Sequence, residues 1–231
     1  MRFGIIAAGE GSRLALEGSS QPKPLVPIAG VPMIERLARI FMNCGADRIA
    51  VIVNDRNPDT VSYVRRMSAH MPVDLVVKST PTPMHSLMEL APYLGRERFC
   101  VTTVDTVFRE NELADMMKAF ESTSYDGLMG VTSLIDDEKP LYVDTDSDML
   151  IRGFLDEQGG CRFVSAGIYA LRARALDVLA HCLEGGQTRM RYFQRRLLED
   201  GMRLKAFDMG RVIDVDHVGD IEKAQDIAQE R

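Results

Sequence analysis

Apolar runs of strand length alternate with segments of helical spacing through the first half of the chain. Four runs stand out: Phe3–Ala7, Ile49–Val53, Val73–Val77 and Phe99–Val104. Between them, apolar residues recur every three or four positions, as in Ile34–Phe41 and Leu113–Phe120, and this spacing predicts amphipathic helices. Strands that alternate with helices in this way predict βαβ units and a largely parallel sheet.

From about Gly127 the pattern changes to consecutive strands. These cover Leu128–Thr132, Leu141–Val143, Met149–Leu155 and Phe163–Leu171, before helical spacing returns. We expect them to add mixed or antiparallel pairs that form a lid over one side of a ligand site. Near-continuous apolar stretches such as VTTV and IAVIV suit strands that helices cover on both faces. The predicted fold class is therefore α/β, a Rossmann-like doubly wound mixed sheet.

Length and composition fit one globular domain. The chain has 231 residues, of which 45% are hydrophobic and 27% charged, and this is enough to bury a substantial core. No apolar run approaches the roughly 18 residues that a membrane span needs. The opening MRFGIIAAG is typical of a buried first strand and not of a secretory signal. We therefore expect a cytoplasmic protein that does not enter a membrane.

Cysteine spacing and net charge exclude several classes of site. The four cysteines lie far apart with no CxxC pair, which gives no support to a zinc knuckle or a redox motif. The formal net charge is −6 and no long basic run is present, which argues against a nucleic-acid surface. We therefore expect a small anionic ligand in a local positive pocket, and the composition is compatible with a homo-oligomer.

A glycine-rich loop follows the first predicted strand. Gly9 and Gly11 let the backbone turn sharply and bring N–H groups close to a polyanion. Arg13 and Lys23 add positive charge, and the prolines on both sides of Lys23 restrict its backbone. The dinucleotide fingerprint GxGxxG needs a third glycine where this chain has Leu14, and no Gly-Lys-Ser/Thr follows to make a P-loop. Ligands of doubly wound sheets gather at the carboxyl ends of the strands, where this loop lies.

Together, AAGEGSRL and PKPLVPIAGVPMIERL resemble the signature of the sugar-phosphate nucleotidyltransferases, the nucleotide-sugar pyrophosphorylases. The resemblance implies the nucleotide-diphospho-sugar transferase fold, one domain over residues 1–231, a nucleoside triphosphate donor and Mg²⁺. It assigns residues 1–125 to nucleotide binding and residues 126–231 to the acceptor and a second metal ligand. Arg13 and Lys23 are the implied catalytic residues. The implied nucleotide-binding residues are Ala8, Gly9, Gly11, Ser12, Arg13, Ser79 and Thr80.

Two acidic segments are candidates for binding the metal. Asp105 follows a buried strand at the expected crevice, where the resemblance places the family's metal-binding aspartate. Asp214 and Asp216 lie in the segment VIDVDH, which resembles a late segment of the family before a carboxy-terminal helix. Either of them is a candidate second ligand, and Asp216 is also a candidate N-cap of that helix. His217 is expected to have no part in metal binding, since Mg²⁺ prefers oxygen ligands.

The acceptor site departs from the family pattern. Gly130, Ser165 and Gly167 match positions that contact the acceptor, the last two in FVSAGIY. The family's acceptor lysine is missing near Leu155–Gln158, where Arg152 or Arg162 is the candidate replacement. The sequence Glu-Lys-Pro at 138–140 precedes the strand pair that it should follow, so we interpret it as unrelated to the acceptor.

The base-reading segment leaves the nucleotide open. Relatives have a glycine-containing turn before a helix, whereas this chain has STPTPMHSL from Ser79 to Leu87. The MHSL stretch is similar to the choline-phosphate cytidylyltransferases, although core and helix-start roles are more common for Met84 and His85.

The predicted function is transfer of a nucleoside monophosphate from a nucleoside triphosphate to a phosphorylated small-molecule acceptor, most simply a sugar 1-phosphate. The alternatives are a choline-phosphate-type cytidylyltransferase and a non-catalytic nucleotide-binding member of the fold. A nucleotide-sugar-dependent glycosyltransferase would leave PKPL unexplained.

Overall fold

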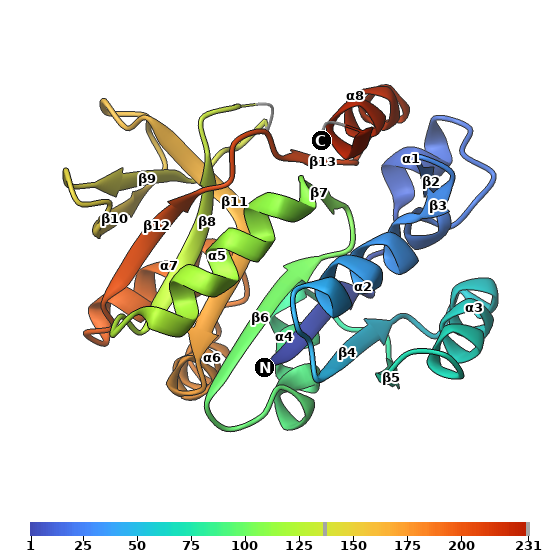
Figure 1. Ribbon diagram of the computed structural model, residues 1–231, viewed down its shortest axis with the longest axis horizontal. Helices are drawn as coiled ribbons and strands as arrows, with labels where there is room; N and C mark the ends of the chain where they lie inside the picture. Colours follow the sequence, from blue (N-terminus) through green and yellow to red (C-terminus); the bar gives the residue numbers. More distant parts are fainter. Residues whose placement is uncertain (136–137, 230–231) are drawn as a thin grey trace.

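The computed structural model describes residues 1–135 and 138–229, in which nine strands form one mixed sheet. Its main path runs in the order β10-β9-β11-β6-β1-β4-β5, and β8 joins it by pairing with β11 and β12 (Figure 1). Strands β6, β1, β4 and β5 are parallel, whereas β11 runs antiparallel to β6 and β8. The sheet is therefore parallel in its first half and mixed in its second.

The first half of the chain supplies the parallel strands and their crossover helices. Its elements are β1 (Arg2–Ala7), α1 (Ser12–Leu16), a 3₁₀ turn (Lys23–Leu25), β2 (Pro27–Ile28), β3 (Val31–Pro32), α2 (Met33–Asn43), β4 (Arg48–Val53), α3 (Pro58–Ser68), β5 (Val73–Val77), α4 (Pro83–Leu90), a second 3₁₀ turn (Ala91–Tyr93), β6 (Arg98–Thr103), β7 (Thr106–Val107) and α5 (Glu110–Ser122).

The second half supplies the mixed part of the sheet and the last three helices. Its elements are β8 (Gly127–Thr132), β9 (Tyr142–Thr145), β10 (Ile151–Leu155), β11 (Phe163–Arg172), α6 (Arg174–Glu184), α7 (Met190–Glu199), β12 (Leu204–Asp208), β13 (Ile213–Asp214) and α8 (Val218–Gln229).

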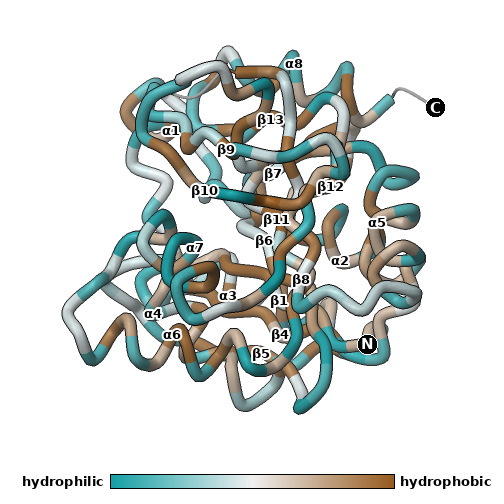
Figure 2. Tube along the Cα trace, turned by 90° about the vertical axis from the view of Figure 1, so that its left-hand side faces the viewer, coloured by the Kyte–Doolittle hydropathy of each residue, from teal (hydrophilic) through white to brown (hydrophobic). Residues whose placement is uncertain are grey.

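Helices cover the sheet on both faces and bury two apolar cores. One core joins α2, α3, α5 and α8 to the sheet, and the other joins α4, α6 and α7 to its opposite face. Figure 2 shows hydrophobic segments along the central strands, with α2 and α5 on one side and α4, α6 and α7 on the other. Every residue of β8 is buried, as expected for a strand covered twice. The doubly wound α/β fold predicted from the sequence is confirmed.

Two sequence predictions differ from the structure in detail. The strand predicted to begin at Met149 begins at Ile151, because Met149 has a positive φ of 64° in a turn where Asp146 accepts hydrogen bonds from two backbone N–H groups. The strands expected to form a lid instead continue the central sheet, since β11 pairs with β6 and β9 pairs with β11. Backbone pairing thus places the second half in the same layer as the first.

None of the helices in the part of the chain that the structure describes has the length and apolar character that crossing a bilayer requires.

Candidate active site

The loop after β1 is built around a glycine that packs directly on Lys23. Gly11 has a φ of 62° and immediately precedes α1. A Cβ atom placed on Gly11 would lie 2.7 Å from the Cβ atom of Lys23, which is closer than carbon atoms approach. The loop and the Lys23–Leu25 turn are therefore in contact only because position 11 has no side chain.

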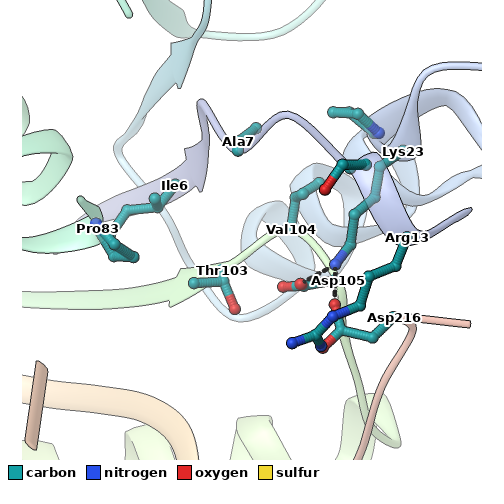
Figure 3. A pocket seen from close by; sticks show the side chains of 13 residues that line it. Ile6, Ala7, Arg13, Lys23, Pro83, Thr103, Val104, Asp105 and Asp216 are labelled. Atoms are coloured by element: carbon teal, nitrogen blue, oxygen red, sulfur yellow. Dashed lines mark hydrogen bonds and ion pairs between the residues drawn. The ribbon is translucent and has the colours of Figure 1, made fainter. Parts of the chain in front are cut away.

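The ammonium group of Lys23 lies between two carboxylates (Figure 3). It forms an ion pair with Asp105, which follows β6, and donates to Asp216 Oδ1 at 2.6 Å. The guanidinium group of Arg13 donates from Nη1 to the other oxygen of Asp216 at 2.8 Å. The structure thus brings together Arg13, Lys23, Asp105 and Asp216, which the sequence separates by up to 203 positions.

The charged groups in this cluster shift one another's pKa values. Burial alone would lower the pKa of Lys23, but the carboxylates of Asp105 and Asp216 outweigh it and the pKa is raised above its ordinary value. Burial would raise the pKa of Asp216, but the hydrogen bond from Lys23 and the nearby Arg13 hold it below its ordinary value. Both groups are therefore charged at neutral pH.

Asp214 lies beside the same cluster through a short backbone pairing. Strand β13 pairs antiparallel with β7, placing Asp214 opposite Thr106, and the Val215 N–H donates to the Asp105 carbonyl at 3.0 Å. Part of the Asp214 side chain is open to a cavity. Burial among protein atoms, and then the charge of Asp105, raise its pKa well above the usual carboxylate range.

One oxygen of this acidic group lacks a protein partner. Asp105 Oδ1 is buried and accepts no hydrogen bond. Within the described ranges, no three His, Cys, Asp or Glu side chains are arranged as a preformed metal site. The carboxylates of Asp105 and Asp216 nevertheless reach a common cation, the ammonium of Lys23.

Two cavities meet along the glycine-rich loop. The first, of about 400 Å³, is lined by the loop residues Gly9, Gly11, Ser12 and Arg13 and by Lys23, Asp105 and Asp216. The second, of about 690 Å³, is lined by Ala8, Ser79, Thr80, Thr82 and Ser86 among others. Gly9 and Pro83 line both cavities. All of the residues predicted to bind nucleotide line one cavity or the other.

A third cavity lies on the other side of the Arg13–Asp216 pair. Its volume is about 280 Å³, and Ser165, Asp214 and Glu138 are among the residues that line it. Arg13 and Asp216 line both this cavity and the first one, so their ion pair forms a partition between them. The two cavities are therefore neighbours that share one charged pair.

Three residues predicted to bind the acceptor have other surroundings, and none of the three is among the described residues that line the third cavity. Gly130 is buried in β8, where an added Cβ would lie 3.0 Å from Ile168 Cβ. Gly167 has a φ of 69° in the irregular part of β11 and so re-aims that strand. Arg162 is exposed, with its guanidinium 4.8 Å from the centre of the Phe163 ring.

Asn54 and Glu138 lie at the site, although neither was predicted there from the sequence. Asn54 is 4% exposed and its Nδ2 donates to the carbonyl oxygens of Ala8 and Gly9, which fixes the start of the loop. The signal was present, because Asn54 follows an apolar strand just as Asp105 does. Glu138 lines the third cavity, although the Glu-Lys-Pro sequence was interpreted as unrelated to it. The backbone carbonyl of Lys139 accepts from Arg191 at 3.0 Å.

Two contacts at the rim of the site were also not foreseen. Glu17, just after α1, accepts a hydrogen bond from the Val218 N–H at 2.8 Å and contacts His217 Nδ1 at 2.5 Å. This contact lowers the pKa of Glu17 and raises the pKa of His217. Asp216, a candidate N-cap of α8, uses its carboxylate for Lys23 and Arg13 instead.

Comparisons with known proteins find a matching family model and several relatives. The family model described as "MobA-like NTP transferase domain" matches residues 4–200. The bifunctional protein GlmU of Methanococcus maripaludis strain C7 is 22% identical over 227 residues, covering 95% of this chain and 52% of that protein. The chain thus spans about half the length of the curated relatives it matches.

Two further likenesses are shorter or structural. A 2-aminoethylphosphonate cytidylyltransferase from Lancefieldella rimae is 43% identical over 49 residues, covering 21% of this chain and 20% of that protein. The solved structure of the inositol-1-phosphate CTP transferase from T. maritima has a TM-score of 0.79 at 18% identity, covering 99% of this chain and 98% of that one. The resemblance inferred from AAGEGSRL and PKPL is confirmed.

Proposed function

The chain belongs to the MobA-like NTP transferase domain family, and we propose that it transfers a nucleoside monophosphate from a nucleoside triphosphate to a phosphorylated small molecule. The observation that carries this proposal is the position of the Arg13–Asp216 pair, which separates the loop-lined cavity from the third cavity. A donor phosphate and an acceptor phosphate would meet at this partition.

The reaction would be an in-line displacement at the α-phosphorus. An oxygen of the acceptor phosphate forms the new bond to the α-phosphorus, and the bond from that phosphorus to the bridging oxygen of pyrophosphate breaks. The attacking oxygen is already anionic, so no side-chain nucleophile or base is needed, and positioning and charge stabilisation account for the catalysis. Pyrophosphate leaves with the electron pair of the broken bond.

The residues of the cluster would divide the phosphate charge between them. The N–H groups around Gly9 and Ser12, with the guanidinium of Arg13, would hold the β- and γ-phosphates at the first cavity. Lys23 would contact the α-phosphate and the acceptor phosphate, because its ammonium lies below the loop and beside Asp216. The nearby carboxylates, whose charge raises the pKa of Lys23, keep it protonated for this role.

The carboxylates fit Mg²⁺, which would neutralise phosphate charge when bound. The buried, unpartnered Asp105 Oδ1 is suited to a cation, and Asp105 and Asp216 already share one. Mg²⁺ is usually held by one or two carboxylates together with phosphate oxygens and water, which agrees with the small number of protein ligands here. Asp105 and Asp216 would be the ligands, with Asp214 beside them.

A sugar 1-phosphate is the first candidate acceptor. The fold shared with the inositol-1-phosphate CTP transferase supports an acceptor built on a polyhydroxylated ring. Ser165 lines the third cavity and offers a hydroxyl, while Gln194 accepts from Ser165 Oγ at 3.0 Å and fixes its orientation. A cavity of about 280 Å³ is large enough for one such ring with its phosphate outside.

A zwitterionic acceptor, as in a choline-phosphate-type cytidylyltransferase, is the second candidate. Carboxylates dominate the charged lining of the third cavity, where Glu138 and Asp220 join Asp214 and Asp216. Such a lining suits a cationic head group better than a neutral sugar. The short likeness to a 2-aminoethylphosphonate cytidylyltransferase supports the same class.

A pyrophosphate-release screen tests the proposal. Each common nucleoside triphosphate is paired with a panel of sugar 1-phosphates, inositol 1-phosphate, phosphocholine and 2-aminoethylphosphonate, with Mg²⁺ present. We expect release with one nucleotide and one acceptor class, and its loss in Lys23→Ala. Nucleotide binding without release across the whole grid would instead support a non-catalytic member of the fold.

A further inference from the structure

The carboxy-terminal segment from Ile213 to Val218 crosses the rim of the site and is anchored differently on its two sides. On the side of Asp105 it is held by backbone, because β13 pairs with β7 and the Val215 N–H bonds to the Asp105 carbonyl. On the side of the glycine-rich loop, the hydrogen bonds and ion pairs of the described residues are all made by side chains of the loop region. These contacts come from Arg13, Lys23 and Glu17.

Two of these three side chains have another role during the proposed reaction. Arg13 and Lys23 contact Asp216 in the structure, at 2.8 and 2.6 Å, but both line the cavity assigned to the donor phosphates. When phosphates enter, the two cations would turn to them, and the carboxylate of Asp216 would turn to Mg²⁺. Asp216 would therefore lose its contacts with Arg13 and Lys23 when the substrates bind, which is when its position must be fixed.

Glu17 is different, because it is not part of the lining of the site's cavities. It is absent from the described residues that line the three cavities of the site. Its carboxylate accepts from the Val218 N–H, the first N–H of α8, and contacts His217 Nδ1. A carboxylate is favoured at the start of a helix, where N–H groups lack partners and the helix dipole is positive.

We propose that Glu17 is a positioning residue that holds the segment carrying Asp214 and Asp216 against the glycine-rich loop while the substrates are bound. The inference rests on the proposed function, since only a phosphate-bound site releases the other two contacts. Glu17 directly follows α1 on the side of the glycine-rich loop, whereas its partners His217 and Val218 belong to the carboxy-terminal segment, so one carboxylate joins both sides of the cleft. It acts through Asp216 and touches no reacting atom.

The expected effect is on metal binding and turnover and not on nucleotide affinity. Removing a group that orients a metal ligand typically costs 10–100-fold in metal affinity or activity. Glu17→Ala should therefore raise the Mn²⁺ dissociation constant measured by electron paramagnetic resonance, with nucleotide present, by about tenfold or more. The turnover number should fall by a similar factor, while the KM for the nucleoside triphosphate should change little.

Hydrogen exchange measures directly whether Glu17 holds the Val218 N–H. In Glu17→Ala the amide of Val218 should exchange faster, whereas the amides of β1 should keep their wild-type rates. Glu17→Gln keeps an oxygen for the Val218 N–H and an amide that can donate to His217, so it should retain most of the metal affinity. Asp115→Asn is the matched control, because Asp115 is an exposed carboxylate on α5 that forms an ion pair with Lys118, far from the site.

The outcomes separate this inference from the proposed function. An unchanged Mn²⁺ affinity and an unchanged Val218 exchange rate in Glu17→Ala would overturn the proposed positioning role of Glu17, even if wild-type turnover is high. Absence of turnover in the wild-type chain would overturn the proposed function, while exchange and Mn²⁺ titration would still decide the role of Glu17. If Glu17→Ala does not fold, His217→Ala removes one of the two contacts, and a smaller loss in the same direction is expected.

Discussion

The Nζ atom of Lys23 lies 2.6 Å from Asp216 Oδ1, although 193 positions separate the two residues. The same ammonium pairs with Asp105, so one cation serves two carboxylates at the centre of the site. Lys23 is largely buried there, with 11% of its side chain exposed, and the two carboxylates depend on it for charge balance. This arrangement leads to predictions that do not require knowledge of the acceptor.

Replacing Lys23 should make the protein less stable and more responsive to divalent cations. Lys23→Met leaves Asp105 and Asp216 facing each other, and the free energy of unfolding should fall by about 1–3 kcal/mol, less than for a fully buried pair because Asp216 is half open to solvent. Added Mg²⁺ should restore more stability in the variant than in the wild type. Urea unfolding with and without Mg²⁺ measures both effects.

Lys78→Met is the control for this experiment, because the Lys78–Glu89 pair is exposed on both sides. Exposed pairs contribute little, so its unfolding curve should stay close to that of the wild type. Equal effects of the two substitutions would contradict the assigned role of Lys23.

Asp105→Asn should abolish most of the turnover. The variant loses the negative charge that would bind the metal. It also places an amide beside the Lys23 ammonium, and this ammonium needs a hydrogen-bond acceptor. Losing one such charge contact costs on the order of 3 kcal/mol, or about 100-fold in rate. The measurement is pyrophosphate release with the best substrate pair from the screen, and a rate near that of the wild type would remove Asp105 from the site.

Two glycines of the loop should differ sharply in their tolerance of alanine. Gly11→Ala forces a side chain to within 2.7 Å of Lys23 Cβ at a φ of 62°, and it should destabilise the fold by about 1–3 kcal/mol. Gly9→Ala meets no atom within 4 Å and should change stability by less than about 0.5 kcal/mol. Thermal unfolding of the two variants compares them directly, and similar melting temperatures would contradict this packing.

Much of the fold was predictable, because the first four strands and the helices between them follow apolar periodicity. The loop and Asp105 were predictable for a related reason, since the carboxyl ends of parallel strands converge at one edge. Glu17 was not, because its role depends on Val218, 201 positions away, and periodicity carries no information about such a contact. Gly130 does not line the third cavity, because Ile168 and Met209 pack directly against it within the sheet, and the sequence pattern gives no sign of this packing.

Asn54→Asp should loosen the start of the loop. The amide of Asn54 donates to the carbonyl oxygens of Ala8 and Gly9, and an aspartate there would place a charge against two acceptors. Leaving buried acceptors unpaired costs about 1–3 kcal/mol, so the melting temperature should fall and nucleotide binding should weaken. Calorimetric titration with the preferred nucleoside triphosphate tests this, and Asn111→Asp, at an exposed position on α5 away from the three cavities, gives the comparison.

Acid should weaken the contact that joins β4 to β5. The hydrogen bond from Arg48 holds the pKa of Asp74 below its ordinary value of 3.8, with a smaller contribution from Arg2. A carboxylate with a lower pKa in the folded chain stabilises the fold above its unfolded pKa, and this stabilisation is lost as the pH falls through the folded pKa. Asp74→Asn should therefore be less stable than the wild type at neutral pH.

The difference between Asp74→Asn and the wild type should shrink as the pH falls below the ordinary value of 3.8. Urea unfolding of both chains across this range measures the difference. A gap that stays constant with pH would mean that Asp74 does not stabilise the fold through its charge.

The late position of the segment from Ile213 to Val218 in the sequence means that the two sides of the site are synthesised at different times. The glycine-rich loop is synthesised first, whereas Asp216 emerges near the end of the described chain, beyond the residues 4–200 that the family model matches. During synthesis, Arg13 and Lys23 therefore have no Asp216 to bind until almost all of the sheet has been made. A nascent or truncated chain that ends after β12 would contain the loop and Asp105 but would lack the half of the site that completes it.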